Sequence, residues 1–273
     1  MIRKPIVSGQ FYPEDKEELS KVIEAYLSCE ASRVGLSGKI SAKGIILPHA
    51  GYSYSGKVAV TTVNKVLPKK KLILLGTNHS GAGQDFSLWA KGSWEIPSGQ
   101  IKIDEALAQS ILSKGSRVKE DYLAHEFEHS LEVELPILQH IFGKFEFIPI
   151  SCKTSALEAY QETANQIFEA VKNIKNEILF VASTDLTHYE PDSTARKKDR
   201  IVLEAIINLD EQSLMEKVYR ENISICGLAP AVVLLLCLKK LGARKAQVAL
   251  YQTSGDACGD YNSVVGYAGV IIK

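Results

Sequence analysis

Residues able to bind a metal or move a proton stand directly after short apolar runs of the 273-residue sequence. His49 follows residues 44–47, His79 follows 72–76, Asp185 and His188 follow 178–182, and Cys258 follows 247–251. If these runs are strands of one sheet, their carboxyl ends share a rim, where functional groups collect in open α/β sheets. Two imidazoles and a thiolate suffice to hold a divalent metal with an open position, so His49, His79 and Cys258 are candidate ligands. His188 is a candidate general base, with Asp185 orienting its ring.

A second histidine pattern points to a different chemistry. The segment from His125 to His129 matches H-E-x-x-H, which zinc metallopeptidases use to place two ligands and a base on one helix. Here the apolar helical stripe begins only at Leu131, and Ser130 is the expected helix cap. The pattern is therefore expected in a loop and first turn, which makes a metallopeptidase the least favoured alternative. His129 is instead a candidate substrate contact or catalytic neighbour at the rim.

Two aromatic residues in expected loops are candidates for the wall of a cleft. Phe11 lies in Gly9–Pro13, and Tyr54 lies in the glycine- and tyrosine-rich stretch after His49. Such rings could contact an aromatic or peptide ligand, although half-buried packing is the simpler interpretation. Cys29, Cys226 and Cys237 are not candidates, because they fall on apolar helical stripes or at helix starts, where a free cysteine usually acts as a small apolar residue. No phosphate-binding glycine motif is present.

The elements that must position these residues alternate between short apolar runs and longer amphipathic ones, which is typical of an α/β fold. Several strand candidates are almost continuously apolar, as in a sheet covered on both faces. The order of the strands in the sheet is not readable from the sequence. Strands are predicted at 44–47, 72–76, 86–90, 145–150, 178–182, 247–251 and 264–272. Helices are predicted at 17–27, 56–67, 104–113, 131–142, 156–172, 194–209, 211–219 and 229–241.

Composition restricts the class of protein. The 32 basic and 32 acidic residues give zero net charge, so electrostatics offers no reason to expect nucleic acid or an anionic membrane as partner. The longest apolar run, 228–238, is shorter than the ~18–20 residues that cross a bilayer. Five cysteines without a C-x-x-C pair fit a reducing compartment, so we expect a cytoplasmic protein. No linker-like tract interrupts the chain, which indicates one domain over residues 1–273.

Taken together, the motifs resemble the Memo family, which is named for a mediator of cell motility and includes the AmmeMemoRadiSam system protein B of microbes. The resemblance runs in order over essentially the whole chain. It implies a fold similar to the class III extradiol ring-cleaving dioxygenases, an α/β/α sandwich around a mixed, mostly parallel sheet. The motifs that carry it are residues 9–13, 47–56, 76–79, 128–132, 183–189 and the region of Cys258.

The resemblance also implies functional roles. His49 and His79 match the two metal-binding histidines of the dioxygenases, and His188 matches their base. Cys258 matches a cysteine that replaces their carboxylate ligand, which changes metal preference and redox behaviour. The implied cofactor is Fe(II), with Zn or Cu as rivals, and the implied activity is oxidative or redox-linked on an unknown substrate. The alternative is a non-catalytic module that binds a peptide or protein through Phe11, Tyr54 and the same histidines. The AmmeMemoRadiSam grouping further implies association with a radical-SAM protein.

Overall fold

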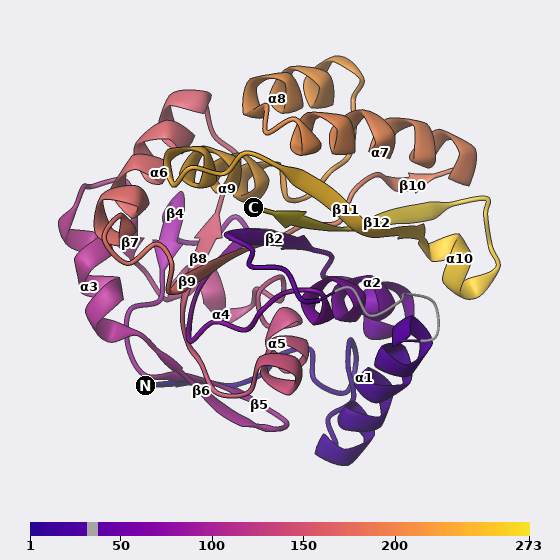
Figure 1. Ribbon diagram of the computed structural model, residues 1–273, viewed down its shortest axis with the longest axis horizontal. Coiled ribbons are helices and arrows are strands. Elements are labelled where there is room, and N and C mark those ends of the chain that lie inside the picture. Colours follow the sequence, from indigo (N-terminus) through magenta and orange to yellow (C-terminus); the bar gives the residue numbers. More distant parts are fainter. Residues whose placement is uncertain (32–37) are drawn as a thin grey trace.

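The computed structural model describes residues 1–31 and 38–273 (Figure 1). It is a three-layer α/β/α sandwich, in which helices cover both faces of a large mixed sheet. The strands are β1 (Ile2–Arg3), β2 (Gly44–Leu47), β3 (Lys71–Thr77), β4 (Phe86–Leu88), β5 (Ser93–Ile96), β6 (Gly99–Ile103), β7 (Lys119–Glu120), β8 (Glu146–Cys152), β9 (Ile178–Ser183), β10 (His188–Glu190), β11 (Ala246–Thr253) and β12 (Val264–Ile272). The helices are α1 (Lys16–Ala31), α2 (Tyr52–Asn64), α3 (Glu105–Ser113), α4 (Leu123–Glu126), α5 (Glu134–Phe142), α6 (Leu157–Val171), α7 (Asp192–Ile207), α8 (Glu211–Arg220), α9 (Leu228–Lys240) and α10 (Ser254–Cys258).

The centre of the sheet is parallel. The strand order across the sheet is β1-β5-β6-β8-β3-β9-β2-β12-β10, and the central strands β8, β3, β9 and β2 all run in the same direction. These strands are almost continuously apolar and buried, because helices cover both of their faces. The last strand, β12, runs antiparallel to β2 and carries β11 as its other partner. The carboxyl ends of β3, β9 and β2 therefore lie next to one another at one rim.

Different helices cover the two faces of the sheet. On one side α2 contacts β2, β11 and β12, and α1 and α5 pack against α2. On the other side α9 lies across β2, β3, β8 and β9, with α6 against it; Figure 1 shows α9 and α6 above the sheet and α2 and α5 below it. Helix α9 is apolar all round because both the sheet and other helices bury it. No helix in residues 1–31 and 38–273 is long and apolar enough to span a bilayer.

The predicted fold class is confirmed, and the main elements lie where the hydrophobic pattern placed them. Residues 44–47 and 264–272 form strands with the predicted bounds, and Asp104 caps α3 through the backbone N–H of Leu107. The elements that the pattern missed are short or polar: β1, β5, β6, β7, β10, α4 and α10. Ser130 does not cap α5, which begins only at Glu134 after the N-cap Val133. The residues before α5 are thus an irregular turn at the rim.

Candidate metal centre

The site begins with two histidines that the central strands bring together. His49 lies two residues beyond the end of β2, and His79 lies two residues beyond the end of β3. Strand β9 lies between them and ends at Ser183. The imidazole centroids of His49 and His79 are 5.2 Å apart. The structure thus brings these two side chains together at the rim, since β2, β9 and β3 are parallel and their carboxyl ends lie side by side.

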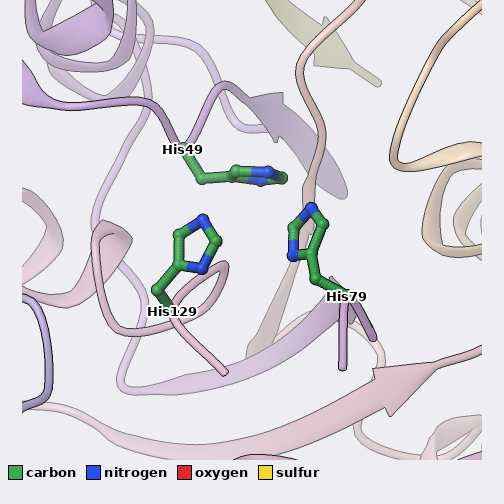
Figure 2. Close-up of side chains that lie close together, drawn as sticks. All are labelled: His49, His79 and His129. Atoms are coloured by element: carbon green, nitrogen blue, oxygen red, sulfur yellow. The ribbon is translucent and has the colours of Figure 1, made fainter. Parts of the chain in front are cut away.

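His129 completes the group from the irregular turn before α5. Its ring stacks on His79 at 4.8 Å between centroids and lies edge-on to His49 at 5.5 Å. Figure 2 shows the three rings converging on one space. Each ring offers a nitrogen, and these atoms all lie within 4.8 Å of one another. The turn reaches the end of β3 because Gly76 has no side chain: a Cβ there would lie 2.6 Å from Leu131 Cγ.

Glu128 fixes the ring of His79. Its carboxylate accepts the backbone N–H of His79 at 2.6 Å, pairs with His79 Nδ1 at 2.9 Å and accepts the N–H of Ser130 at 2.8 Å. Burial opposes ionisation of Glu128, but the hydrogen bonds and charge of His79 outweigh it and lower the Glu128 pKa to about 2. Burial likewise opposes protonation of His79, and Glu128 again outweighs it, so the pKa of His79 is raised. Since Nδ1 faces Glu128, Nε2 is the nitrogen left for a metal.

His49 is held from its other side by Ser183. The Ser183 hydroxyl lies 2.8 Å from His49 Nδ1, and the backbone N–H of His49 donates to Asp185 at 2.9 Å. Burial, reinforced by His129 and His79, lowers the pKa of His49 well below its usual value. Burial also lowers the pKa of His129. Two of the three rings are therefore neutral near pH 7, which is the form that ligates metals. This donor set fits a divalent transition metal.

The cysteine nearest to the histidines is Cys226, which sequence reasoning set aside as a core residue. Its Sγ lies 3.4 Å from His49 Nε2 and accepts the backbone N–H of Asp185 at 3.2 Å. Burial raises the pKa of this thiol to about 12, so it is protonated without a metal. The loop approaches β9 because Gly227 has no side chain: a Cβ there would lie 2.2 Å from Thr184 Cβ. The Cys226–Gly227 pair just before a helix was the available signal.

Cys258, the predicted third ligand, does not join this group. It is exposed at the end of α10, and in the part of the chain that the structure describes the metal-ligating group consists of histidines alone. The register gives the reason. Ile46 of β2 and Val248 of β11 both lie opposite Val270 of β12, so β12 separates the two strands. Strand β11 then continues to Thr253, whereas β2 ends at Leu47, which carries the segment of Cys258 beyond the rim.

His188 and Asp185 lie close to the site but are not paired as predicted. His188 Nδ1 is 2.8 Å from the carbonyl oxygen of Ser224, whose hydroxyl also accepts the backbone N–H of His188. Asp185 accepts the N–H of His49 instead, and burial raises its pKa to about 6. The orienting group of His188 is therefore a backbone carbonyl. The same loop carries Ser224 and Cys226, so it connects His188 to His49.

The H-E-x-x-H pattern does not form a peptidase site. His125 is fully buried in α4, where its Nε2 lies 2.8 Å from the carbonyl oxygen of Ser87 and its ring lies 5.6 Å from that of Trp94. Burial lowers the pKa of His125 to about 4. His129 lies beyond the end of α4 and faces the other histidines. The two histidines are not on one helix, so the geometry that the peptidase chemistry needs is missing.

The two aromatic candidates differ in position. The ring of Phe11 lies edge-on to that of His129 at 5.0 Å between centroids, which places it at the edge of the histidine group. Phe11 also borders a cavity of about 490 Å³ whose wall includes Tyr12, Tyr26 and Tyr52. Tyr54 lies on α2 with 42% of its surface exposed. Phe11 thus separates the histidines from an aromatic hollow, and Tyr54 stays a prediction.

Comparison with known proteins finds relatives of this chain in sequence and in fold. A family model described as Memo-like protein matches residues 3–271. A MEMO1 family protein of Methanopyrus kandleri is 39% identical over 100% of this chain and 99% of its own length. Another from Aquifex aeolicus is 40% identical over 99% of this chain and 98% of its own length. A crystal structure of an uncharacterized Escherichia coli K12 protein covers 84% of this chain and 98% of its own, with a TM-score of 0.52 at 15% identity, which shows the shared fold.

Proposed function

The chain belongs to the Memo-like protein family, and from that membership and its histidine group we propose that it is a metal-dependent protein with oxidative or redox-linked activity on a small molecule. One observation carries the proposal. Three separate segments deliver His49, His79 and His129 so that their ligand nitrogens lie within 4.8 Å of one another. Two of these rings are also held by hydrogen bonds at the nitrogen facing away from the group, as in protein metal sites.

The three histidines would hold the metal, with Cys226 as a neighbouring sulfur ligand. Fe(II) is the metal we propose, and Zn or Cu would accept the same imidazole set. When bound, the metal would supply Lewis acidity and, for Fe or Cu, electron transfer to a ligand. The Cys226 thiol must lose its proton to ligate. Burial raises its pKa, but a bound metal ion would lower it and so favour the thiolate. A sulfur ligand would favour a softer metal than a carboxylate would.

His188 is the base that we propose for this site. The Ser224 carbonyl can only accept a hydrogen bond, so Nδ1 of His188 carries a hydrogen when it donates there. In the neutral ring Nε2 then holds a lone pair that can accept a proton from a substrate. Phe11 packs against His129 and limits the space beside the group. The chain thus supplies a base, oriented ligands and an apolar wall.

Metal content tests the proposal. Protein purified without oxygen in the presence of Fe(II), Zn or Cu should hold metal in a fixed ratio, and the His49→Ala/His79→Ala double variant should lose it. His140→Ala is the matched control, because His140 lies on α5 and pairs with Glu24 at the surface. Equal metal in the wild type and the double variant would end the proposal. A panel of catechols with the Fe(II) protein then tests the ring-cleaving subclass through coloured products.

A second candidate function is peptide or protein binding without catalysis. The cavity of about 490 Å³ beside Phe11 favours it, because its wall carries several tyrosines as well. Peptide binding that survives metal removal and is lost in Phe11→Ala would support this candidate. Metal-dependent turnover of a small molecule would favour the enzyme instead.

A further inference from the structure

Behind His49, away from the other two histidines, Ser183 sits at the centre of a buried polar group. Its hydroxyl oxygen lies 2.8 Å from His49 Nδ1, 2.7 Å from the carbonyl oxygen of Ser130 and 2.9 Å from Glu134 Oε1. Ser183, Ser130 and Glu134 are all fully buried. A serine hydroxyl has one hydrogen to donate and two lone pairs to accept with. Three neighbours therefore use its whole capacity, and each must play a definite role.

The Ser130 carbonyl decides these roles. A carbonyl oxygen can only accept, so the single hydrogen of Ser183 must point at Ser130. The two remaining neighbours must then donate to Ser183. For His49 this requires a hydrogen on Nδ1, and for Glu134 it requires a protonated carboxyl group. Any other assignment would place two oxygen lone pairs against each other at 2.7 Å.

The surroundings of Glu134 agree with a neutral acid. Its second oxygen, Oε2, is buried and makes no hydrogen bond among the residues that the structure describes. An ionised carboxylate left in this way would be far more costly than a neutral carbonyl oxygen. Burial raises the Glu134 pKa well above its usual value, and the charge of Asp185 acts in the same direction. Glu134 opens α5, but a helix N-terminus favours a negative charge only weakly compared with desolvation.

We propose that Glu134 is a positioning residue which works as a neutral acid: through Ser183 it fixes a hydrogen on Nδ1 of His49 and so presents the bare Nε2 to the metal. This inference rests on the proposed function of the histidine group. The sulfur of Cys226 lies 3.4 Å from the same Nε2, on the metal side of the ring. Glu134, Ser183 and His49 thus form one chain of hydrogen bonds from α5 through β9 to the loop after β2.

Three variants test the assignment. Glu134→Gln keeps a neutral donor of nearly the same shape, so its affinity for Zn²⁺ should stay within about threefold of the wild type. Glu134→Leu removes the donor, and Ser183→Ala removes the hydroxyl that joins it to His49. Each should weaken Zn²⁺ binding by about 10–100-fold, the usual effect of losing a group that orients a ligand. If Glu134→Gln loses as much affinity as Glu134→Leu, a carboxylate is required and the proposal is wrong.

Two spectroscopic readings need no metal. Nitrogen chemical shifts of the His49 imidazole should report hydrogen on Nδ1 in the wild type and in Glu134→Gln, and a changed or mixed tautomer in Ser183→Ala. Infrared difference spectra between the wild type and Glu134→Gln should contain the carbonyl band of a protonated carboxylic acid. Absence of that band, or hydrogen on Nε2 in the wild type, would overturn the proposal. Failure of the wild type to bind Zn²⁺ would instead contradict the metal site, while these readings still decide the state of Glu134.

Discussion

The carboxylate of Glu128 provides the sharpest quantitative test of the site. It is 2% exposed and accepts hydrogen bonds from the backbone and ring of His79 and from the backbone of Ser130. Its pKa falls from 4.5 to about 2 in the folded protein, a difference of roughly 2.5 units. At about 1.4 kcal/mol per unit, the native contacts favour the charged form by ~3 kcal/mol. Glu128→Gln should therefore lower the free energy of unfolding by ~2–3 kcal/mol, since the amide oxygen retains part of the hydrogen bonding.

The pH dependence of this difference follows from the two partners. The folded pKa of Glu128 lies below the unfolded value, so its contribution is present above about pH 4.5 and is lost as the pH falls toward about 2. The folded pKa of His79 lies above 6.5, so its share is complete below about pH 6.5 and is lost as the pH rises through the folded pKa. The stability difference between the wild type and Glu128→Gln should be largest near pH 5.5.

Urea unfolding of metal-free protein at several pH values measures this difference. Glu126→Gln is the matched control, because Glu126 lies two residues earlier and is exposed. The free energy of unfolding of Glu126→Gln should stay within about 0.5 kcal/mol of the wild-type value. Glu128→Gln should also weaken Zn²⁺ binding by about 10–100-fold, because the carboxylate orients His79. Equal stability of the wild type and Glu128→Gln near pH 5.5 would refute the reasoning.

Other parts of the molecule give further predictions. Arg3→Met removes a buried guanidinium that binds Glu132 and the carbonyl oxygens of His125 and Glu128, so the free energy of unfolding should fall by ~3–5 kcal/mol. Arg200→Met at the surface should change it by less than about 1 kcal/mol, and equal urea midpoints for the two variants would contradict this. Gly227→Ala should lower the free energy of unfolding by ~1–3 kcal/mol, because the new methyl group overpacks against Thr184, and it should also weaken metal binding. Gly38→Ala, where the added methyl group meets no atom, is the control; thermal unfolding and Zn²⁺ titration measure both effects. Zn²⁺ affinity should fall as the pH drops through the raised pKa of His79, because the metal competes with a proton; calorimetric titration giving a flat profile would exclude His79 as a ligand.

The sequence predicted the part of the site that local pattern controls. His49 and His79 follow strands whose apolar runs are clear, and parallel strands end at the same rim, so both side chains were expected there. That the two meet also depends on strand order, because only β9 lies between β2 and β3. Cys258 also follows a strand, but β12 separates that strand from β2, and the register moves its end past the rim. Strand order and register depend on contacts between distant segments, which the pattern of one sequence does not contain.

The site residues whose role sequence reasoning did not identify lie on irregular segments. His129 was expected at the rim as a substrate contact or catalytic neighbour and not as part of the metal-binding group, and Cys226 was set aside as an apolar residue. Each segment reaches the rim because a glycine leaves room for a neighbour: Gly76 for the side chains of Ser130 and Leu131 in the turn of His129, and Gly227 for Thr184. The position of a glycine in the sequence does not identify the segment that packs against it, so these contacts could be found only in the structure.

The position of His129 also depends on contacts with the N-terminal segment. Arg3 binds Glu132 and the carbonyl of Glu128, and Glu132 also accepts the backbone N–H of Val7 and the hydroxyl of Tyr12. These contacts tie the N-terminal segment to the turn that carries His129. Because breaking a buried ion pair is strongly destabilising, β1 and this turn depend on each other for their positions. The position of His129 thus depends on residues far from it in the sequence, so Arg3→Met should weaken Zn²⁺ binding in a calorimetric titration although Arg3 is not a ligand, and unchanged affinity would contradict this.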